Sequence, residues 1–261
     1  MKSIHNDAGA TFRRNMIDTK FYMYSDANGG DPDANSPTLR TYHRLLWSKP
    51  LPSGDPFELI DDKPGHYLFH SSALGEFSLG SDAITHSYKN QIKKKWLTEQ
   101  VPNQVQELFN VGSTIGAYLI FPNKRIDRKQ TINQARGISR LIDDRFDLTL
   151  ECIRRFYIGE TSPLDETIKR YASFFQLFGT FEGYVDFFLL NDLVGEHGDV
   201  KFYLPFDDFR SPPEFKDVKD YLLYKRRAEL FVESRNKRII EYVNNAETTA
   251  SLSTELKREV L

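Results

Sequence analysis

Residues 131–158, TINQARGISRLIDDRFDLTLECIRRFYI, combine the clearest helical pattern in the chain with a dense set of charges. Their apolar side chains recur every three or four positions, a spacing that places them on one face of an α-helix. That face comprises Ile142, Phe146, Thr149, Ile153 and Phe156, widened by Leu150 and Tyr157. The pattern predicts a helix over residues 141–158 that packs its apolar face against the core.

The opposite face of this predicted helix is charged. Three acids and one base fall along one line, namely Asp144, Asp147, Glu151 and Arg155. Such a line is either the site of a metal-dependent hydrolase or a solvated helix face. Arginines neighbour the acids, and Glu151 precedes Arg155 in the favourable i, i+4 order. The sequence therefore favours a core helix with matched acids, and we assign no metal ligand.

A basic segment precedes this helix. Residues 113–122, STIGAYLIFP, have the composition of a buried strand, and the loop NKRIDRKQ (123–130) connects them to the helix start. Backbone N–H groups at a helix start face outward and attract anions. No Walker A pattern, G-x-x-x-x-G-K-[ST], accompanies the junction. We predict that five residues here bind a ligand: Arg125, Arg128, Asn133, Arg136 and Arg140.

The stretch SPTLRTYHRLLW (36–47) predicts a second helix, with Ser36 as its N-cap and Pro37 at its first position. Arg40 on this helix is a further candidate ligand-binding residue. His43 is a candidate catalytic residue, because Arg40 and the nearby Arg44 would lower its pKa and keep its imidazole neutral. The alternative is a partly buried histidine with a structural role.

Short antiparallel strands are predicted at residues 56–61, 66–72 and 75–84. The second contains His70, our other candidate catalytic residue, followed by two serines. No Gly-x-Ser-x-Gly motif accompanies them, so the sequence does not support a serine hydrolase. The acids of DANGGDPDAN (26–35) miss the EF-hand spacing, and this segment is predicted to be a solvated turn.

Beyond residue 160 the chain is predicted to be mostly helical, over residues 161–179, 181–194 and 215–245. The expected fold class is α+β, with a small, mainly antiparallel sheet and short helices in the N-terminal half packed on a C-terminal helical portion. We expect a mobile arm (1–19), a single domain (20–245) with lobes 20–130 and 131–245, and a polar tail (246–261).

Composition constrains the setting of the protein. The 261 residues include 35 Lys and Arg against 37 Asp and Glu, a net charge of −2, so any nucleic-acid binding must come from a local patch. The single cysteine, Cys152, excludes an intramolecular disulfide and a cysteine-based zinc site. No signal peptide or membrane span is recognisable. We expect a cytoplasmic protein without membrane association.

Three parts of the chain resemble a family of bacterial and mobile-element proteins of unknown function. They are SPTLRTYHRLLWSKPLPSG (36–54), YLFHSSALGEFSLGSDAI (67–84), and INQARGISRLIDDRFDLTLECIRRFY (132–157) with GYVDFFLLNDLV (183–194). The resemblance covers residues 20–245. It implies membership of the family, and it implies no activity, cofactor or catalytic residue.

Two functional hypotheses remain from the sequence. The first is a protein that binds or acts on a phosphate-bearing ligand, a nucleotide or nucleic acid, where the arginines meet His43 or His70. The alternative is a non-enzymatic interaction protein or homo-oligomer whose aromatic residues continue to the surface. A metal-dependent hydrolase that uses the acid line is third. The sequence identifies no cofactor.

Overall fold

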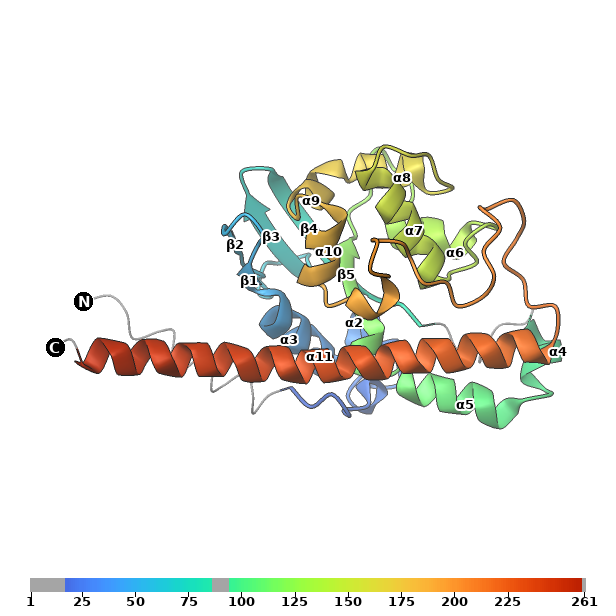
Figure 1. Cartoon of the computed structure of the whole chain (residues 1–261), viewed down its shortest axis with the longest axis horizontal. Helices are drawn as coiled ribbons and strands as arrows, with labels where there is room; N and C mark the ends of the chain where they lie inside the picture. The colour runs from blue at the N-terminus through green and yellow to red at the C-terminus, as the bar shows by residue number, and fades with distance from the viewer. Residues whose placement is uncertain (1–16, 86–93, 260–261) are drawn as a thin grey trace.

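The computed structural model describes the backbone of residues 17–85 and 94–259, and the side chains of these ranges up to residue 245. The first 16 residues of the predicted arm lie outside the described part of the chain. Two small antiparallel sheets and a larger set of helices form the fold (Figure 1). The predicted α+β class is therefore confirmed.

The central sheet has the strand order β3-β4-β5 and is antiparallel throughout. Its strands are β3 (Leu68–Ser72), β4 (Gly75–Ala83) and β5 (Tyr118–Pro122). In the register of β4 with β5, Ser81 pairs with Ile120 and Asp82 with Leu119. A separate ribbon joins β1 (Lys49–Pro50) to β2 (Pro56–Phe57). Because side chains alternate along a strand, Ser81 and Asp82 point to opposite faces of the sheet.

The N-terminal half also contains short helices. In chain order they are η1 (Met23–Ser25), α2 (Pro32–Asn35), α3 (Pro37–Trp47), α4 (Lys95–Thr98), α5 (Pro102–Val111) and η3 (Ile115–Ala117). The predicted start of α3 is confirmed, since the Ser36 hydroxyl accepts a hydrogen bond from Leu39 N at 3.1 Å. Asp31 caps α2 in the same way through Asp33 N. The predicted turn at residues 26–35 thus contains a short helix.

The C-terminal half is helical, with more interruptions than the sequence predicted. Its elements are α6 (Ile132–Ile138), α7 (Phe146–Tyr157), α8 (Asp165–Arg170), α9 (Ala172–Gln176), α10 (Phe181–Phe187), η4 (Asn191–Leu193) and α11 (Val218–Glu259). The helix predicted from residue 141 begins instead at Phe146. Asp143 and Asp144 have φ angles of +45° and +62°, which no helix accommodates.

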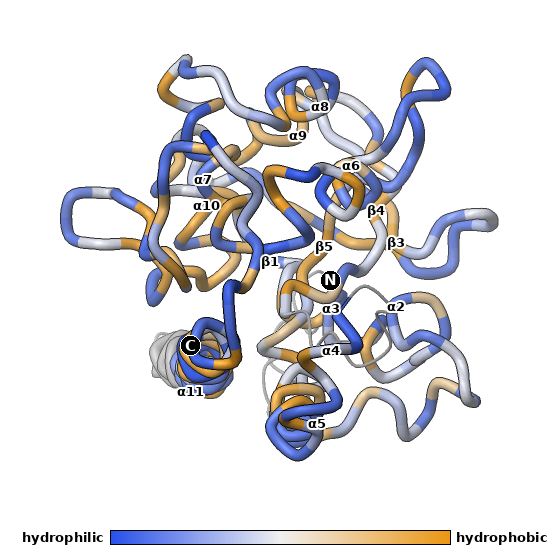
Figure 2. The backbone as a smooth tube through the Cα atoms, turned by 90° about the vertical axis from the view of Figure 1, so that its right-hand side faces the viewer, coloured by the Kyte–Doolittle hydropathy of each residue, from blue (hydrophilic) through white to orange (hydrophobic). Residues whose placement is uncertain are grey.

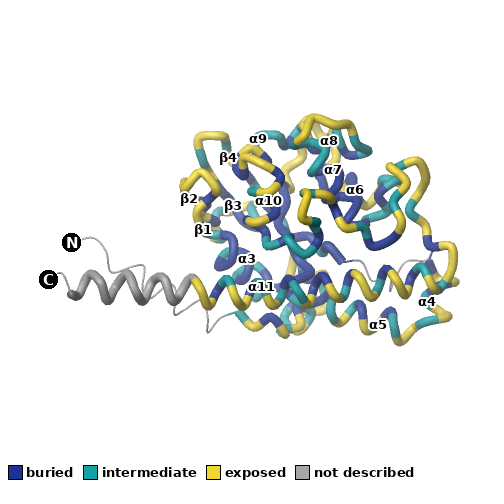
Figure 3. The backbone as a smooth tube through the Cα atoms, in the orientation of Figure 1, coloured by how far each residue is buried: buried dark blue, intermediate teal, exposed yellow. Residues whose placement is uncertain are grey.

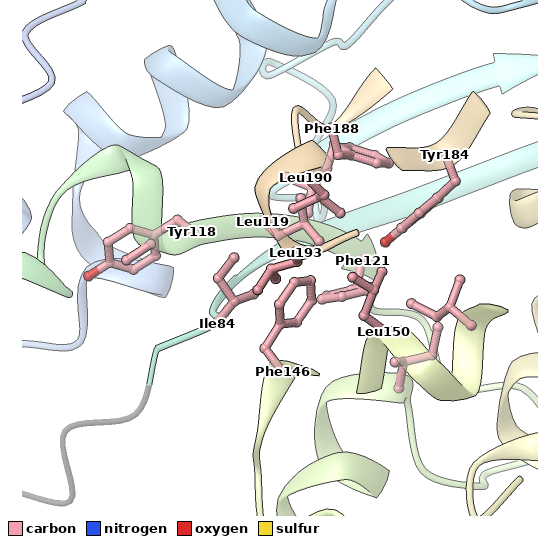
Figure 4. Close-up of a cluster of buried hydrophobic side chains, with 14 of the residues drawn as sticks. Ile84, Tyr118, Leu119, Phe121, Phe146, Leu150, Tyr184, Phe188, Leu190 and Leu193 are labelled. Carbon is pink, nitrogen blue, oxygen red and sulfur yellow. The ribbon is translucent and has the colours of Figure 1, made fainter. Parts of the chain in front are cut away.

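The core lies between β5, α7 and α10. Figure 4 shows Leu119 and Phe121 of β5 meeting Phe146 and Leu150 of α7, while Tyr118 points away from them. All four core residues are at most 2% exposed. The predicted burial of the helix over residues 141–158 is thus confirmed for its apolar face.

Helix α11 runs along one side of the whole body and beyond it (Figure 1). It lies beside α5, as the perpendicular view also shows (Figure 2), and it contacts η3 and η4. Buried and exposed residues alternate along its path over the body (Figure 3). The helix extends to Glu259, through most of the segment predicted to be a polar tail.

Candidate functional site

Arg136 lies at the centre of a closed polar network. Its guanidinium is fully buried and donates from Nη1 to Asp82 Oδ2 at 2.5 Å and to Ala83 O at 3.2 Å. Nη2 donates to Asp144 O at 2.7 Å, and Nε donates to Thr149 Oγ1 at 3.3 Å. Every nitrogen of Arg136 therefore has a protein partner. This network fastens α6 and the turn before α7 to the end of β4.

The other face of β4 carries a second network. The indole Nε1 of Trp47 donates to His43 Nδ1 at 3.1 Å, and His43 Nε2 lies 3.0 Å from Ser81 Oγ. Ser81 Oγ in turn donates to Asp33 Oδ1 at 2.7 Å. Because an indole can only donate, His43 Nδ1 accepts and Nε2 carries the proton. In this series of hydrogen bonds each donor therefore lies on the Trp47 side of its acceptor, and the series ends at Asp33.

His43 and Asp33, the two titratable groups in this series of hydrogen bonds, differ in their proton affinity. Burial, with a smaller contribution from Arg235, lowers the pKa of His43 to about 3. Burial raises the pKa of Asp33 to about 6, although its hydrogen bond from Ser81 opposes the rise. The pKa of His43 is lowered, as predicted from the sequence. The predicted cause, Arg40 and Arg44, was wrong, because burial and Arg235 lower it instead. Of these two groups, Asp33 has the pKa closer to neutrality.

Two further groups adjoin Asp33. The Tyr67 hydroxyl is buried beside Ser81 and lacks a hydrogen-bond partner of good geometry in the described part of the chain. The guanidinium carbon of Arg40 lies 5.5 Å from the centroid of the Tyr67 ring. Arg40 Nη2 donates to the carbonyl oxygens of Asp61 and His66, and its Nε is buried without a partner. Hereafter, the Asp33 cluster denotes Asp33, Arg40, His43, Tyr67 and Ser81.

The basic loop predicted to bind anions lies at the surface. Residues 123–130 are all exposed, as are two more predicted residues outside the loop, so the exposed candidates are Arg125, Arg128, Asn133 and Arg140. The start of α6 is closed by its own side chains, because Thr131 Oγ1 accepts from Gln134 N and the Gln134 side chain accepts from Thr131 N and from Arg125 Nε. Among the described residues, no hydrogen bond or ion pair joins this loop to the Asp33 cluster.

His70 occupies a separate aromatic environment. Its ring lies 4.1 Å from that of Phe57 and is nearly parallel to that of Phe77 at 6.1 Å. Nδ1 is 2.9 Å from Glu58 O, whereas Nε2 is buried without a partner. Burial lowers the pKa of His70. A cavity of about 770 Å³ opens beside the next residue, Ser71, between the β3–β4 turn and the turn before α10.

Arginines engage each acid of the predicted line, of which Asp144 precedes α7 and Asp147 and Glu151 lie on it. Asp144 pairs with Arg136 at 3.3 Å. Asp147 is fully buried and accepts from Arg145 and from Tyr203 N. Glu151 accepts from Arg154 and Arg155, both at 2.8 Å. Where side chains are described, within residues 17–85 and 94–245, there is no group of three metal-ligating side chains.

Thus the structure brings together only two of the predicted site residues, Arg40 and His43. It adds Asp33, Ser81 and Tyr67, which the sequence did not single out. The sequence predicts that Asp33 belongs to a solvated turn, and it offers no signal that the Asp33 carboxylate reaches β4. Ser81 and Tyr67 lie in or beside strands, where hydroxyl residues are common.

Comparison with known proteins gives one match. The model of a family of unknown function, DUF6994, matches residues 17–239. Neither the curated proteins nor the solved structures include a significant match. In the described residues, no helix combines the length and the apolar composition needed to cross a membrane.

Proposed function

The chain belongs to this family of unknown function, so we propose a function from its own geometry: it binds a phosphate-bearing ligand, a nucleotide, at the Asp33 cluster. The observation that carries the proposal is the convergence of a cation, an unpartnered hydroxyl and a carboxyl group that titrates near neutrality. They come from α3, the segment before β3, and α2.

Each member of the cluster has a distinct role in this proposal. Arg40 supplies positive charge for the phosphate, and Tyr67 supplies a buried hydroxyl donor that has no protein acceptor in good geometry among the described residues. Asp33, with its pKa of about 6, accepts or releases a proton at the ligand. Ser81 and His43 hold the carboxyl group in place.

Calorimetric titration of the full chain tests the proposal, with inorganic phosphate, AMP, ADP, ATP and adenosine as probes. We expect phosphate-bearing probes to bind at least about tenfold more tightly than adenosine, and the difference to shrink as salt is raised. Arg40→Gln should weaken binding about tenfold or more. The matched control is Arg44→Gln, one helical turn away, whose side chain pairs with Asp61 at 2.9 Å.

Two results would contradict the proposal. One is equal affinity for adenosine and its phosphates. The other is an Arg40→Gln variant that binds as well as Arg44→Gln while both remain folded.

A second candidate function is self-association through α11. Most aromatic residues lie in the core, so the surface aromatic patch expected from the sequence is limited to Tyr22 and Trp96 among the strongly exposed residues of the described chain. Helix α11 instead exposes aliphatic side chains: Leu222, Leu223, Leu230 and Ile240. Light scattering of the protein and of Leu230→Glu tests this candidate. A concentration-dependent dimer that the substitution dissociates supports it, and a monomer at all concentrations excludes it.

A further inference from the structure

The cavity of about 770 Å³ beside Ser71 lies where three parts of the chain meet, and the Asp33 cluster takes no part in it. They are residues 51–56 of the β1–β2 ribbon, residues 71–74 at the β3–β4 turn, and residues 176–183 before and in α10; the ribbon lies beside β3 (Figure 1). Its buried lining is apolar, since Leu51, Leu177 and Phe178 are at most 6% exposed. Pockets that hold ligands have volumes of about 300–1,000 Å³, so this cavity is large enough for one.

One edge of β3 is open beside this cavity. Phe69 exchanges two backbone hydrogen bonds with Ile60 on the side away from β4, at 2.8 and 2.9 Å. The backbone groups of successive residues point alternately to the two sides of a strand. The N–H and C=O of Ser71 therefore point to the same side as those of Phe69. The residue that would pair with Ser71 on this side is Glu58, two positions before Ile60.

The pair between Glu58 and Ser71 does not form. The Glu58 carbonyl accepts a hydrogen bond from His70 Nδ1 at 2.9 Å instead, and no backbone hydrogen bond joins residues 58 and 71 in the described structure. Two positions before Glu58 the chain has Pro56, which lacks an N–H and cannot extend the pairing. Ser71 is exposed and thus presents a backbone donor and acceptor at the wall of the cavity. An open strand edge of this kind can pair with another chain.

The rim of the cavity is acidic. Asp55 is the only charged residue that lines it in the described part of the chain. Two further exposed acids flank Ser71, namely Glu58 on the open side and Glu76, which pairs with Ser71 in the register of β3 with β4. A second copy of this chain, paired edge to edge at Ser71, would bring the acids of both chains together, and like charges across strands repel. A basic partner instead complements the rim.

We propose that this cavity binds an extended, basic peptide segment of a partner protein, which adds a strand to the open edge of β3. The peptide residue opposite Ser71 exchanges two backbone hydrogen bonds with it. An aliphatic side chain of the peptide enters the cavity against Leu177 and Phe178, and lysine or arginine at its ends faces the acidic rim. The open edge is short, so affinity depends on the apolar contact together with the two hydrogen bonds.

Fluorescence anisotropy with labelled, end-blocked peptides tests the inference on the full chain. The probe is KTVLVTK, compared with ETVLVTE and with three versions of KTVLVTK that are N-methylated at one of the central V, L and V residues. We expect KTVLVTK to bind at least about tenfold more tightly than ETVLVTE, with the difference shrinking as salt is raised. N-methylation at the residue opposite Ser71 removes a hydrogen bond and should weaken binding about tenfold, whereas N-methylation at a position whose N–H points away should have a smaller effect.

Two results with these peptides would overturn the inference. One is the absence of binding by KTVLVTK. The other is equal affinity for KTVLVTK and all of its N-methylated versions, which would show that no backbone pairing occurs.

Two substitutions at one position provide a matched control in the protein. Ser71→Pro removes the N–H that pairs with the peptide, and it leaves the hairpin intact because this N–H points away from β4. Ser71→Ala keeps the N–H and removes only the hydroxyl. We expect KTVLVTK to bind Ser71→Pro about tenfold more weakly than the wild type and to bind Ser71→Ala with unchanged affinity. Circular dichroism establishes that both variants are folded, and unchanged affinity of folded Ser71→Pro would contradict the inference.

The inference is independent of the proposed nucleotide site. Arg40→Gln, which should weaken nucleotide binding, should bind KTVLVTK with the affinity of the wild type. Loss of peptide binding in folded Arg40→Gln would place the peptide at the Asp33 cluster and overturn the inference.

Discussion

Ser81 and Asp82 are neighbours on β4, and they belong to two different polar networks. On the Asp82 side, a fully buried arginine is bonded at every nitrogen and paired with carboxylates. On the Ser81 side, a directed chain of hydrogen bonds ends at Asp33, which is partly exposed and stands beside an unpartnered tyrosine hydroxyl. In the Arg136 network every guanidinium nitrogen already has a partner, so none is left to bond a ligand.

This difference distinguishes polar groups that stabilise the fold from polar groups that are available to a ligand. A buried charge is tolerated when its partners are complete, and removing one partner is then costly. A buried hydroxyl without a well-placed partner retains hydrogen-bonding capacity that a ligand or a water molecule can satisfy. The predictions below test this contrast, beginning with the largest effect.

Replacing Arg136 by methionine should lower the free energy of unfolding by about 3–5 kcal/mol, because Asp82 would be left buried without its cation. Urea denaturation measures the change. The control is Arg140→Met, whose exposed side chain should contribute less than about 0.5 kcal/mol. Equal effects of the two substitutions would remove the contrast between the networks.

Replacing Asp33 by asparagine should change the pH dependence of stability. Burial raises the Asp33 pKa from 3.8 to about 6, so the folded state binds this proton more tightly than the unfolded state. The resulting stabilisation is complete below about pH 4 and is lost as pH rises through about 6. The stability of the wild type relative to Asp33→Asn should therefore fall by up to about 3 kcal/mol between pH 4 and pH 7. The same pH dependence of stability in the wild type and in Asp33→Asn would contradict this prediction.

Replacing Ser81 by alanine should lower stability by about 1–2 kcal/mol, because His43 Nε2 and Asp33 Oδ1 both lose their partner. Thermal and urea unfolding give the value. Ser78→Ala on the same strand removes only an exposed hydrogen bond to Asn123 and should have a smaller effect. If Ser78→Ala proves as damaging, the hydrogen-bond chain does not hold the site together.

The smallest effect is expected for Tyr67→Phe, within about 0.5 kcal/mol of the wild type, since its hydroxyl has only a contact of poor geometry with Ser81 to lose. Tyr171→Phe is the comparison, because the Tyr171 hydroxyl donates to Lys124 O at 3.0 Å and should cost more. Under the proposed function, Tyr67→Phe should weaken phosphate binding while stability is retained. A variant that is clearly destabilised would show that the hydroxyl has a structural role.

Much of the fold follows from local sequence. Ser36 and Pro37 set the start of α3, and the apolar stripe from Ile142 to Phe156 marks the buried face of α7, because capping and helical periodicity act over only a few residues. The positions at which helices are interrupted are harder to predict from the sequence. Asp144 adopts a positive φ where its backbone meets Arg136, and that contact spans two elements. The sequence pattern of residues 131–158 does not indicate this contact between Asp144 and Arg136.

The candidate site, like the fold, is only partly predictable from local sequence. The sequence by itself identified Arg40 and His43 on one helix, because side chains three positions apart share a face. Only the tertiary structure decided that His43 bonds to Ser81, that Ser81 reaches Asp33, and that Arg136 turns inward while Arg140 stays outside. These outcomes depend on contacts between residues 38 to 54 positions apart and on how much water each group loses. Charge and residue type are local properties, whereas burial and pairing belong to the folded chain.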